Sequence, residues 1–423
     1  MGLFVSIILL FLGIYSHRAH KWWSPDTLFC YMWAVITFFS SLHLYTMYES
    51  SDKVYLIVLW GVLFYFFGTR ISMRTAVKVK NVTSKREFIS PKLFWFLLFF
   101  LFAALIGSFM QSYYLLMSGE ELGAIRDASY GNDDSVGLKV DTGLTGIILD
   151  LVVHLLSPLV CAAGILYFTR DGVKKIHYLI MVLLFVIMQS FTDGGRFGLV
   201  FLIIELIIGF KLVNSLMKNG KKISPKFILI FVSILLFFVF LISFMRGITE
   251  TDIFFTKYYR YLCGDIAYFD SHLQTIDTSD HWSLLGSSFW GFWSIVFPFL
   301  HGFFGFTYPD WYLYTERYIM DTQEFRQIGT NMWTNAFSTP FYYPYADAGW
   351  LGVAVALLLF GLIAGWIYIK AIKERSSKYI IMYLIICQIL FNTIFQYPFV
   401  NKGYVTIFLL LILSGSKLRV FNR

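Results

Sequence analysis

Charged residues are scarce in this sequence. Only 14% of its 423 residues are Asp, Glu, Lys or Arg, and 58% are hydrophobic, whereas soluble domains carry about 25% charged residues. So few charged side chains cannot cover the surface of a water-soluble protein of this length. The composition therefore predicts an integral membrane protein rather than a soluble one.

Cysteines and metal-binding or nucleotide-binding motifs are also scarce. Of the four cysteines, three lie inside apolar runs and Cys263 is alone in a long loop, so they support neither a disulfide framework nor a zinc site. The sequence has no P-loop, dinucleotide-binding fingerprint, Gly-x-Ser-x-Gly elbow or HExxH motif. Asp133 and Asp134 lack the further ligands of a metal site. We therefore expect no metal and no cofactor, and a substrate that arrives already activated.

The sequence does contain a series of long apolar segments. A membrane-spanning helix needs about 20 mostly apolar residues, and fewer where the bilayer thins or flanking side chains reach the interface. The first segment is followed rather than preceded by basic residues, the reverse of a secretory signal, so we expect it to be retained. We predict about 11 transmembrane helices, near residues 2–15, 25–45, 54–68, 93–117, 147–168, 178–192, 197–213, 227–245, 346–369, 379–397 and 403–414.

The basic residues predict how these helices are oriented. Of the 34 Lys and Arg, 24 lie in the alternate loops at 16–24, 69–92, 169–177, 211–226, 370–378 and 415–423. Because short cytoplasmic loops are enriched in Lys and Arg, we predict an external N-terminus and a cytoplasmic C-terminus, N-out/C-in. The same distribution accounts for the net charge of +8, which therefore gives no indication of nucleic acid as a partner.

The predicted fold is an all-α integral membrane protein in which residues 1–423 form a single polytopic domain. Two external loops stand out, at 118–146 and at 246–345. The smaller is rich in acids and predicts a short amphipathic helix followed by a Gly/Asp turn. The larger is rich in Trp, Tyr and Phe and contains five basic residues. We expect the chemistry of this protein to take place in the larger loop or at the membrane ends beside it.

Part of the larger loop is itself apolar. Residues 282–308 contain no Lys, Arg, Asp or Glu and are long enough to cross a membrane. A crossing here would place the basic segments at 370–378 and 415–423 outside. Glycine and proline also interrupt the segment, and aromatic rings are common in the membrane interface. We therefore predict an interfacial or re-entrant helix, with an ordinary twelfth span as the alternative.

Arginines are expected where spanning helices meet the external surface. Arg196 follows two glycines, Arg246 ends a span, and Arg260 lies three residues after Lys257, so that both share a helix face. Guanidinium groups match phosphate oxygens in pairs, and a helix N-terminus after glycines also favours anions. These four residues are therefore candidates for binding an anionic substrate. The alternative is that they reach the interface or pair with nearby acids such as Asp193.

A polar and aromatic stretch leads into the span predicted at 346–369. Asn335, Tyr345 and Asp347 belong to this stretch and are further candidates for substrate binding. Asp347 sits at the predicted helix N-terminus, so its alternative role is that of a helix cap. Glycines suited to close packing between helices follow, at Gly349, Gly352, Gly361 and Gly365.

Four residues are candidates for the catalytic base that an acceptor hydroxyl would need. Asp150 and His154 are four residues apart near the predicted external end of a span, whereas Asp265 and His272 lie in the larger loop. For each of them the alternative is an ordinary hydrogen-bonded polar side chain. Glu205, deep in a predicted span, is either functional or paired with a neighbouring helix.

Two short motifs carry a resemblance to a known family. Thr192-Asp-Gly-Gly-Arg196 opens one span, and Asn331…Thr-Asn335…Tyr-Ala-Asp347-Ala-Gly349-x-x-Gly352 opens another. With about eleven spans and a long external loop before a late helix, the chain resembles the Wzy-type polymerases of bacterial O-antigen and capsular polysaccharides. The resemblance implies a GT-C-like glycosyltransferase in the bacterial plasma (inner) membrane. Its substrates would be oligosaccharides on undecaprenyl diphosphate, joined at the periplasmic or exterior face, with a chain-length regulator as a candidate partner.

The chemistry of the residues fits that resemblance. Undecaprenyl diphosphate is a good leaving group when guanidinium groups stabilise its developing charge, and the aromatic side chains of the larger loop suit sugar faces. We therefore expect an inverting, metal-independent displacement. Two alternatives remain, an O-antigen ligase and a lipid-linked oligosaccharide transporter (flippase). A transporter is expected to carry internal repeats, and the sequence shows none.

Overall fold

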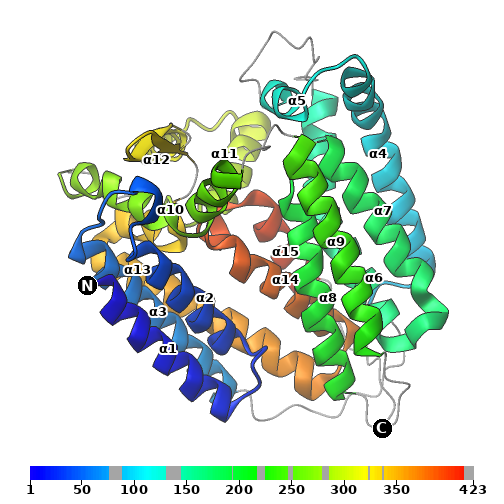
Figure 1. The fold of residues 1–423 in the computed structure, drawn as a ribbon, viewed down its shortest axis with the longest axis horizontal. Coiled ribbons are helices and arrows are strands. Elements are labelled where there is room, and N and C mark those ends of the chain that lie inside the picture. The colour runs from blue at the N-terminus through cyan, green and yellow to red at the C-terminus, as the bar shows by residue number, and fades with distance from the viewer. Residues whose placement is uncertain are drawn as a thin grey trace. The chain divides into compact units, whose positions relative to one another are not determined.

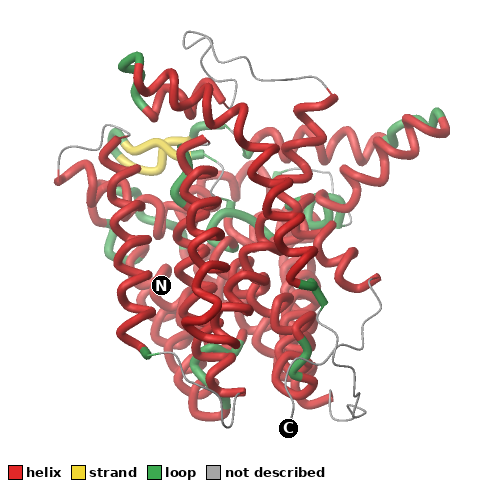
Figure 2. Tube along the Cα trace, turned by 90° about the vertical axis from the view of Figure 1, so that its right-hand side faces the viewer, coloured by secondary structure: helices red, strands yellow, loops and turns green. Residues whose placement is uncertain are grey.

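The computed structural model describes residues 1–75, 88–129, 144–192, 194–216, 224–245, 251–278, 285–322, 324–335 and 338–413. Nearly all of this part is helical, and its strands form one short two-stranded sheet, yellow in Figure 2. Contacts divide the chain into two units. Unit 1 comprises Met1–Lys80, Phe255–Lys370 and Ile389–Ile412, and unit 2 comprises Asn81–Phe254, Ala371–Gln388 and Leu413–Arg423.

A helix lies in each of the predicted apolar segments. These helices are α1 (Gly2–Ala19), α2 (Pro25–Ser40), α3 (Asp52–Thr75), α4 (Pro91–Met117), α6 (Leu144–Asp171), α7 (Ile176–Thr192), α8 (Phe197–Leu216), α9 (Pro225–Met245), α13 (Thr339–Glu374), α14 (Ser377–Asn392) and α15 (Lys402–Leu413) (Figure 1). Among the described residues, α1, α3, α4, α8, α9 and α13 are long and apolar enough to cross a membrane. The fold is therefore that of an all-α, multi-pass membrane protein. The number of crossings and their direction stay predictions.

In unit 1, helices α1, α2 and α3 pack side by side around a buried ion pair. Asp26, at the start of α2, is fully buried, and Nε of Arg70 near the end of α3 lies 3.0 Å from its carboxylate. The hydroxyl groups of Ser16 and Ser24 also donate hydrogen bonds to this carboxylate. These contacts bring together the end of α1, the start of α2 and the end of α3, all of which are predicted to be cytoplasmic.

Glycines set the distance between α3 and α13 in unit 1. A Cβ atom at Gly361 would lie 2.3 Å from the carbonyl oxygen of Tyr65, and one at Gly365 would lie 2.7 Å from that of Thr69. A Cβ atom at Gly68 would likewise lie 2.3 Å from a carbonyl oxygen of α13. Residue numbers rise together along both helices, so α3 and α13 run parallel. The predicted close packing at Gly361 and Gly365 is confirmed.

Helix α13 begins earlier than predicted and is broken. It starts at Thr339 rather than near residue 346, and its helical geometry is interrupted at Ala348 (φ −159°, ψ 34°) and Gly349 (φ 55°, ψ −139°). Backbone angles like those of Gly349 are accessible essentially to glycine alone. The break brings the carbonyl oxygen of Pro344 to 2.0 Å from where a Cβ atom of Gly352 would lie. Gly349 and Gly352 therefore shape α13 itself rather than its packing on α3.

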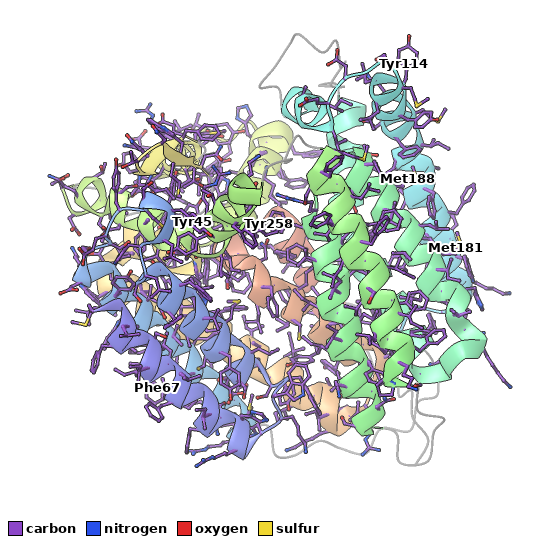
Figure 3. The ribbon with its side chains drawn as sticks, viewed as in Figure 1. Tyr45, Phe67, Tyr114, Met181, Met188 and Tyr258 are labelled. Carbon is purple, nitrogen blue, oxygen red and sulfur yellow. The ribbon has the colours of Figure 1, made fainter. Side chains whose placement is uncertain are left out.

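Helix α10 (Thr251–Asp277) lies within the larger predicted loop. In unit 1 it contacts the C-terminal end of α2 and the N-terminal end of α3. The hydroxyl of Tyr259 donates to the carbonyl oxygen of Phe39 at 2.7 Å and accepts from the amide of Leu44 at 3.0 Å. Further along, the carboxylate of Asp270 accepts hydrogen bonds from the backbone amide and the hydroxyl of Ser51. Figure 3 labels Tyr45 and Tyr258 in this part of unit 1. Both connections lie at helix ends predicted to be external.

The rest of the larger loop forms a hairpin and two helices. Strands β1 (Arg326–Gly329) and β2 (Met332–Thr334) pair antiparallel and follow α12 (Asp310–Asp321). The apolar segment predicted at 282–308 contains α11 (Trp290–Phe304), which has 15 residues, fewer than a typical span. Phe303 and Phe304 at its end are more than 70% exposed. Residues 282–284, at the start of the segment, lie outside the described residues. Whether this segment crosses, re-enters or lies in the interface stays a prediction.

Unit 2 is a bundle in which α4, α6, α7, α8 and α9 pack against one another. The smaller predicted loop, 118–146, contains the helix α5 (Leu122–Ser129), as expected for its first part. Residues 130–143 of this loop lie outside the described residues. Gly209 of α8 lets the side chains of Ile165 and Leu384 approach closely, since a Cβ atom there would lie 2.8 Å from the first.

Candidate functional site

The residues predicted to be functional fall in both units. Those in unit 1 are Lys257, Arg260, Asp265 and His272 of α10, Asn335 directly after β2, and Tyr345 and Asp347 of α13. Those in unit 2 are Arg196, directly before α8, and Asp150 and His154 of α6. The side chains of Asp150 and His154, and the whole of Arg246, lie outside the described part of the structure.

Arg196 is held at the N-terminal end of α8 by a neighbouring helix. Its side chain is buried, and Nη1 donates a 2.7 Å hydrogen bond to the hydroxyl of Ser243 in α9. The Ser243 hydroxyl in turn donates to the carbonyl oxygen of Val239 at 2.6 Å. Gly194, two residues before the arginine, has a positive φ of 58°. Asp193, its proposed alternative partner, lies outside the described residues.

Asp265 and His272 lie on one face of α10, because seven residues are close to two helical turns, or about 10 Å along the axis. Asp265 is fully buried and His272 is 3% exposed. One carboxylate oxygen of Asp265 accepts from the amide of Ile266 at 2.8 Å. The other oxygen, and Nε2 of His272, are buried and have no hydrogen-bond partner among the described residues. Burial raises the pKa of Asp265 well above its usual value and so favours the protonated carboxyl.

Aromatic rings surround His272. Its imidazole lies 4.7 Å from the ring of Tyr268 and 5.4 Å from that of Tyr342, which α13 contributes. Burial, together with the smaller effect of the positive charge of Arg326 in β1, lowers the pKa of His272 to about 4. The imidazole is therefore neutral at pH 7, and a neutral imidazole can accept a proton. The hydroxyl of Tyr268 also donates to the carbonyl oxygens of Thr322, at 3.1 Å, and of Glu324, at 3.3 Å.

Arg260 connects α10 to the hairpin. Its Nη1 donates a 2.8 Å hydrogen bond to the carbonyl oxygen of Trp333 in β2, and its guanidinium lies 5.5 Å from the ring centre of Tyr261. Its Nε is buried and has no hydrogen-bond partner among the described residues. Lys257 is half-buried one helical turn earlier, as the predicted spacing implies. Arg260 and Arg326 therefore place two guanidinium groups on α10 and on the adjacent hairpin.

Tyr345 takes part in a polar cluster at the start of α3. Its hydroxyl donates to the carboxylate of Asp277 at 2.9 Å, and the same carboxylate pairs with the ammonium of Lys53. The ammonium also lies 5.5 Å from the ring centre of Tyr345. Sequence reasoning missed Lys53, Asp277 and Arg326, because each looks like an ordinary charged residue at the end of an element.

Asp347 holds backbone amides in the interior of unit 1 and does not line an open surface. It is fully buried, and its carboxylate accepts hydrogen bonds from the backbone amides of Ser287 at 2.9 Å and Ser288 at 2.7 Å. These amides belong to the turn that precedes α11. The alternative role that the sequence predicted for Asp347, a cap for backbone amides, therefore applies. The capped amides belong to the turn before α11 and not to the N-terminus of α13. Asn335, which directly follows β2, is half-buried.

Two groups of side chains thus meet in unit 1. His272 faces the aromatic start of α13, with Asp265 two turns earlier on α10, and Lys53, Asp277 and Tyr345 form the cluster beside α3. The described residues contain no group of three or more His, Cys, Asp or Glu side chains placed to hold a metal ion. The arrangement can accept a proton at His272, and the positive charge of Arg326 acts on this imidazole.

Comparisons with models of protein families, with curated proteins and with solved structures find no match for this chain.

Proposed function

We propose that this chain is a glycosyltransferase that polymerises oligosaccharide repeat units carried on undecaprenyl diphosphate, forming O-antigen or capsular polysaccharide. The reaction takes place at the external face of the bacterial plasma membrane. One observation carries the proposal: the neutral imidazole of His272 has an unpartnered nitrogen and belongs to the helix that joins the predicted external ends of α2 and α3. The apolar helices support a lipid-linked substrate.

In the proposed step, the acceptor hydroxyl of one repeat unit attacks the anomeric carbon of the growing chain. The bond between that carbon and the diphosphate breaks, and undecaprenyl diphosphate leaves with the bonding electron pair. The hydroxyl proton passes to Nε2 of His272. Guanidinium groups stabilise the charge that develops on the diphosphate, a task that suits Arg260 and Arg326 of unit 1. A single displacement of this kind inverts the anomeric centre.

In this proposal the charge of the substrate raises the pKa of the proposed base, His272. A pKa of about 4 makes the free imidazole of His272 a weak base, partly because of the positive charge of Arg326. A diphosphate bound to Arg326 offsets that charge and moves the pKa of His272 upward, toward the ordinary value of about 6.5. The imidazole therefore becomes a better proton acceptor only when the donor is bound.

Incubation of the purified protein with a lipid-linked repeat unit tests the proposal. We expect a ladder of polymers from the wild type and at least a hundred-fold slower polymerisation by His272→Ala, because general base catalysis typically contributes that much. His301→Ala is the matched control, since His301 is an exposed histidine of α11 that contacts the carbonyl oxygen of Phe306. No ladder from the wild type, or an undiminished rate in His272→Ala, would contradict the proposal.

The product in cells separates polymerase from ligase. A strain lacking a polymerase makes lipopolysaccharide with a single repeat unit, whereas a strain lacking a ligase makes bare core. We expect the single repeat unit, and complementation by the wild-type gene restores the ladder.

A further inference from the structure

An aromatic cluster joins the starts of α4 and α7 in unit 2. The ring of Tyr178 lies 4.9 Å from that of Phe94 and 4.7 Å from that of Tyr167, which α6 contributes. Beside them the ring of Trp95 stacks on the imidazole of His177, with centres 5.9 Å apart. Phe94, Tyr167 and Tyr178 are buried, whereas His177 is exposed. The cluster therefore holds the starts of the two helices together and reaches the surface at the stacked pair.

Three lysines lie beside this cluster. Lys92 is the second residue of α4, and Lys174 and Lys175 end the short 3₁₀ helix Gly172–Lys175 that leads into α7. Lys92 and Lys174 each precede one member of the stacked pair by three residues, so each lies on the same side of its segment as that ring. The ammonium of Lys175 lies 5.5 Å from the ring centre of Tyr178. The fold therefore gathers three ammonium groups at one end of the α4 and α7 pair.

The charge of these lysines is not neutralised within the described part of the chain. None of the three forms an ion pair there. The adjacent carboxylate of Asp171 pairs with Arg170, whose Nε lies 2.8 Å from it. Lys92 and Lys174 are exposed, and Lys175 is half-buried. An anion from outside the protein can therefore reach these ammonium groups.

An apolar surface continues from the lysines along both helices. Lys92, Phe96 and Phe99 are spaced four and three residues apart, so they lie on one face of α4. Phe96 and Phe99 are 65% and 74% exposed, and Ile180 and Leu184 of α7 are 40% and 48% exposed. Helix α4 is long and apolar enough to cross a membrane, so its exposed face meets hydrocarbon. The surface therefore combines a hydrocarbon-facing stripe with unpaired positive charge at its end.

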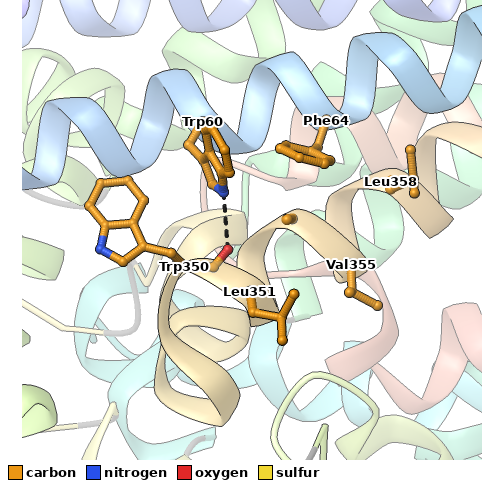
Figure 4. Close-up of a pocket in the computed structure, with 7 residues that line it drawn as sticks. Trp60, Phe64, Trp350, Leu351, Val355 and Leu358 are labelled. Carbon is orange, nitrogen blue, oxygen red and sulfur yellow. Dashed lines mark hydrogen bonds between the residues drawn. The ribbon is translucent and has the colours of Figure 1, made fainter.

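An apolar groove between α3 and α13 in unit 1 gives a contrast. Its volume is about 320 Å³, and its lining side chains are all apolar, among them Trp60 and Trp350 (Figure 4). Nε1 of Trp60 donates a 3.1 Å hydrogen bond to the carbonyl oxygen of Trp350, the dashed line in Figure 4. Lys53, near the start of α3, is already paired with the carboxylate of Asp277. The groove therefore selects no headgroup, whereas the unpaired lysines of unit 2 select a negative one.

We propose that Lys92, Lys174 and Lys175 bind the headgroup of an anionic phospholipid, whose acyl chains lie along Phe96 and Ile180. Basic residues at the ends of membrane helices attract anionic lipids, and each one near the surface adds to the attraction. The stacked rings beside the lysines suit the level of the headgroups, where aromatic side chains are common. A zwitterionic phospholipid carries no net charge and gains much less from the same lysines. The inference does not depend on the proposed function.

Native mass spectrometry of the purified protein tests the inference. The probes are phosphatidylglycerol and phosphatidylcholine with the same acyl chains. We expect the wild type to bind phosphatidylglycerol about ten-fold or more tightly than phosphatidylcholine, because the ammonium groups act on its net charge. An excess of inorganic phosphate should not displace the lipid, since the chains also contribute to binding. Equal affinity for the two lipids, or displacement by inorganic phosphate, would overturn the proposal.

A triple variant removes the charge of the site. We expect Lys92→Gln, Lys174→Gln and Lys175→Gln together to weaken binding of phosphatidylglycerol about ten-fold or more and to leave binding of phosphatidylcholine unchanged. Lys92→Gln and Lys174→Gln alone change exposed side chains, so they decide the matter if the triple variant does not fold. Undiminished binding of phosphatidylglycerol by these variants would overturn the proposal.

The matched control removes three exposed lysines from other segments that are also predicted to be cytoplasmic: Lys21→Gln, Lys211→Gln and Lys226→Gln. Both triple variants lower the net charge by the same amount. We expect the control to change the affinity for phosphatidylglycerol by less than about two-fold, because its lysines lie outside the site. Equal losses in the two triple variants would overturn the proposal in favour of general electrostatic attraction.

Photolabelling in lipid nanodiscs locates the bound lipid. The probes are the same two phospholipids with a diazirine at the start of one acyl chain. We expect peptide mapping to find the phosphatidylglycerol probe on the first turns of α4 and α7 at least about three-fold more than the phosphatidylcholine probe. The groove around Trp60 should label equally with both. Labelling of α4 and α7 that does not depend on the headgroup would overturn the proposal.

Discussion

Asp347 and Ser288 are joined by a 2.7 Å hydrogen bond from the backbone amide of the serine to the buried carboxylate. Together with the bond from Ser287, it ties the turn before α11 to the break in α13. A carboxylate is well suited to this position, because two neighbouring amides would otherwise be buried without an acceptor.

We expect Asp347→Ala to lower the free energy of unfolding by about 2 kcal/mol or more, because two buried amides lose their acceptor. Asp347→Asn keeps one acceptor oxygen and should cost less. Thermal unfolding in detergent measures both variants. Asp310→Ala, which removes an exposed acid in the first turn of α12, is the control and should change stability by less than about 1 kcal/mol. If Asp347→Ala unfolds as the wild type does, the carboxylate does not anchor the turn.

The buried pair of Asp26 and Arg70 should be costly to break on one side. Asp26→Ala leaves the guanidinium, which is 13% exposed, without its carboxylate, and we expect a loss of about 3–5 kcal/mol. Replacing both residues, as in Asp26→Leu with Arg70→Met, should recover most of that loss. The control is Asp171→Ala, which breaks a more exposed pair with Arg170 and should cost at most about 1 kcal/mol. Thermal unfolding of the wild type and the three variants measures these losses of stability. If the double variant loses more stability than Asp26→Ala does, the two residues are not a coupled pair.

A methyl group at Gly361 should push α3 and α13 apart. Its Cβ would lie 2.3 Å from the carbonyl oxygen of Tyr65, and backbone cannot move aside as a side chain can. We expect Gly361→Ala to destabilise the protein by about 1–3 kcal/mol. At Gly302 in α11 a Cβ would meet nothing within 4 Å, so Gly302→Ala should instead be neutral or stabilise by up to about 1 kcal/mol. If Gly361→Ala leaves the melting temperature unchanged or raises it, as expected for Gly302→Ala, the helices are not closely packed at Gly361.

His272 should make the protein less stable in mild acid. Its pKa is about 4 in the folded protein, below the ordinary 6.5, so the unfolded chain binds more protons between those values. Its contribution should therefore be about 2 kcal/mol less favourable at pH 5 than at pH 7. The raised pKa of Asp265 acts in the opposite direction, because its folded form retains a proton that the unfolded chain loses as the pH rises.

The comparison of wild type with His272→Phe isolates the histidine. We expect the variant to gain stability relative to the wild type as the pH falls from 7 to 5, measured by thermal unfolding in detergent. His301→Ala should keep the wild-type dependence on pH. A difference between His272→Phe and wild type that does not change with pH would mean that the imidazole is not held neutral.

Arg196 should be needed for polymer formation, and Ser243 should assist it. We expect Arg196→Ala to reduce full-length polymer in cells at least ten-fold, because a guanidinium contributes strongly to binding a diphosphate. Ser243→Ala removes one hydrogen bond to the guanidinium, worth about 1.5–3 kcal/mol, and should give a smaller loss. Arg170→Ala, at a predicted cytoplasmic end, is the control. Full-length polymer in the Arg196→Ala strain, at normal protein level, would count against the role.

The helices of this protein were accessible to sequence reasoning. Backbone groups in hydrocarbon must bond within their own segment, so that an apolar run long enough to span the membrane implies a helix. The exceptions are at α13, where Gly349 suggested close packing and instead interrupts the helix, and at its start, which extends back to Thr339. Neither the break nor the earlier start follows from the local composition, which is apolar or aromatic on both sides of Gly349.

The candidate site was accessible only in part. Asp265 and His272 could be named because an acid and an imidazole seven residues apart share a helix face, but the burial of His272 against the ring of Tyr342 in α13 depends on a contact with a residue about 70 positions away. Lys53, Asp277 and Tyr345 are separated by up to 292 positions and meet only because α3 and α13 run parallel. The sequence by itself determined that the chain is helical and apolar, because these properties follow from each segment alone. The tertiary structure decided which polar groups meet and where a groove opens, because both depend on the positions of helices distant in the chain.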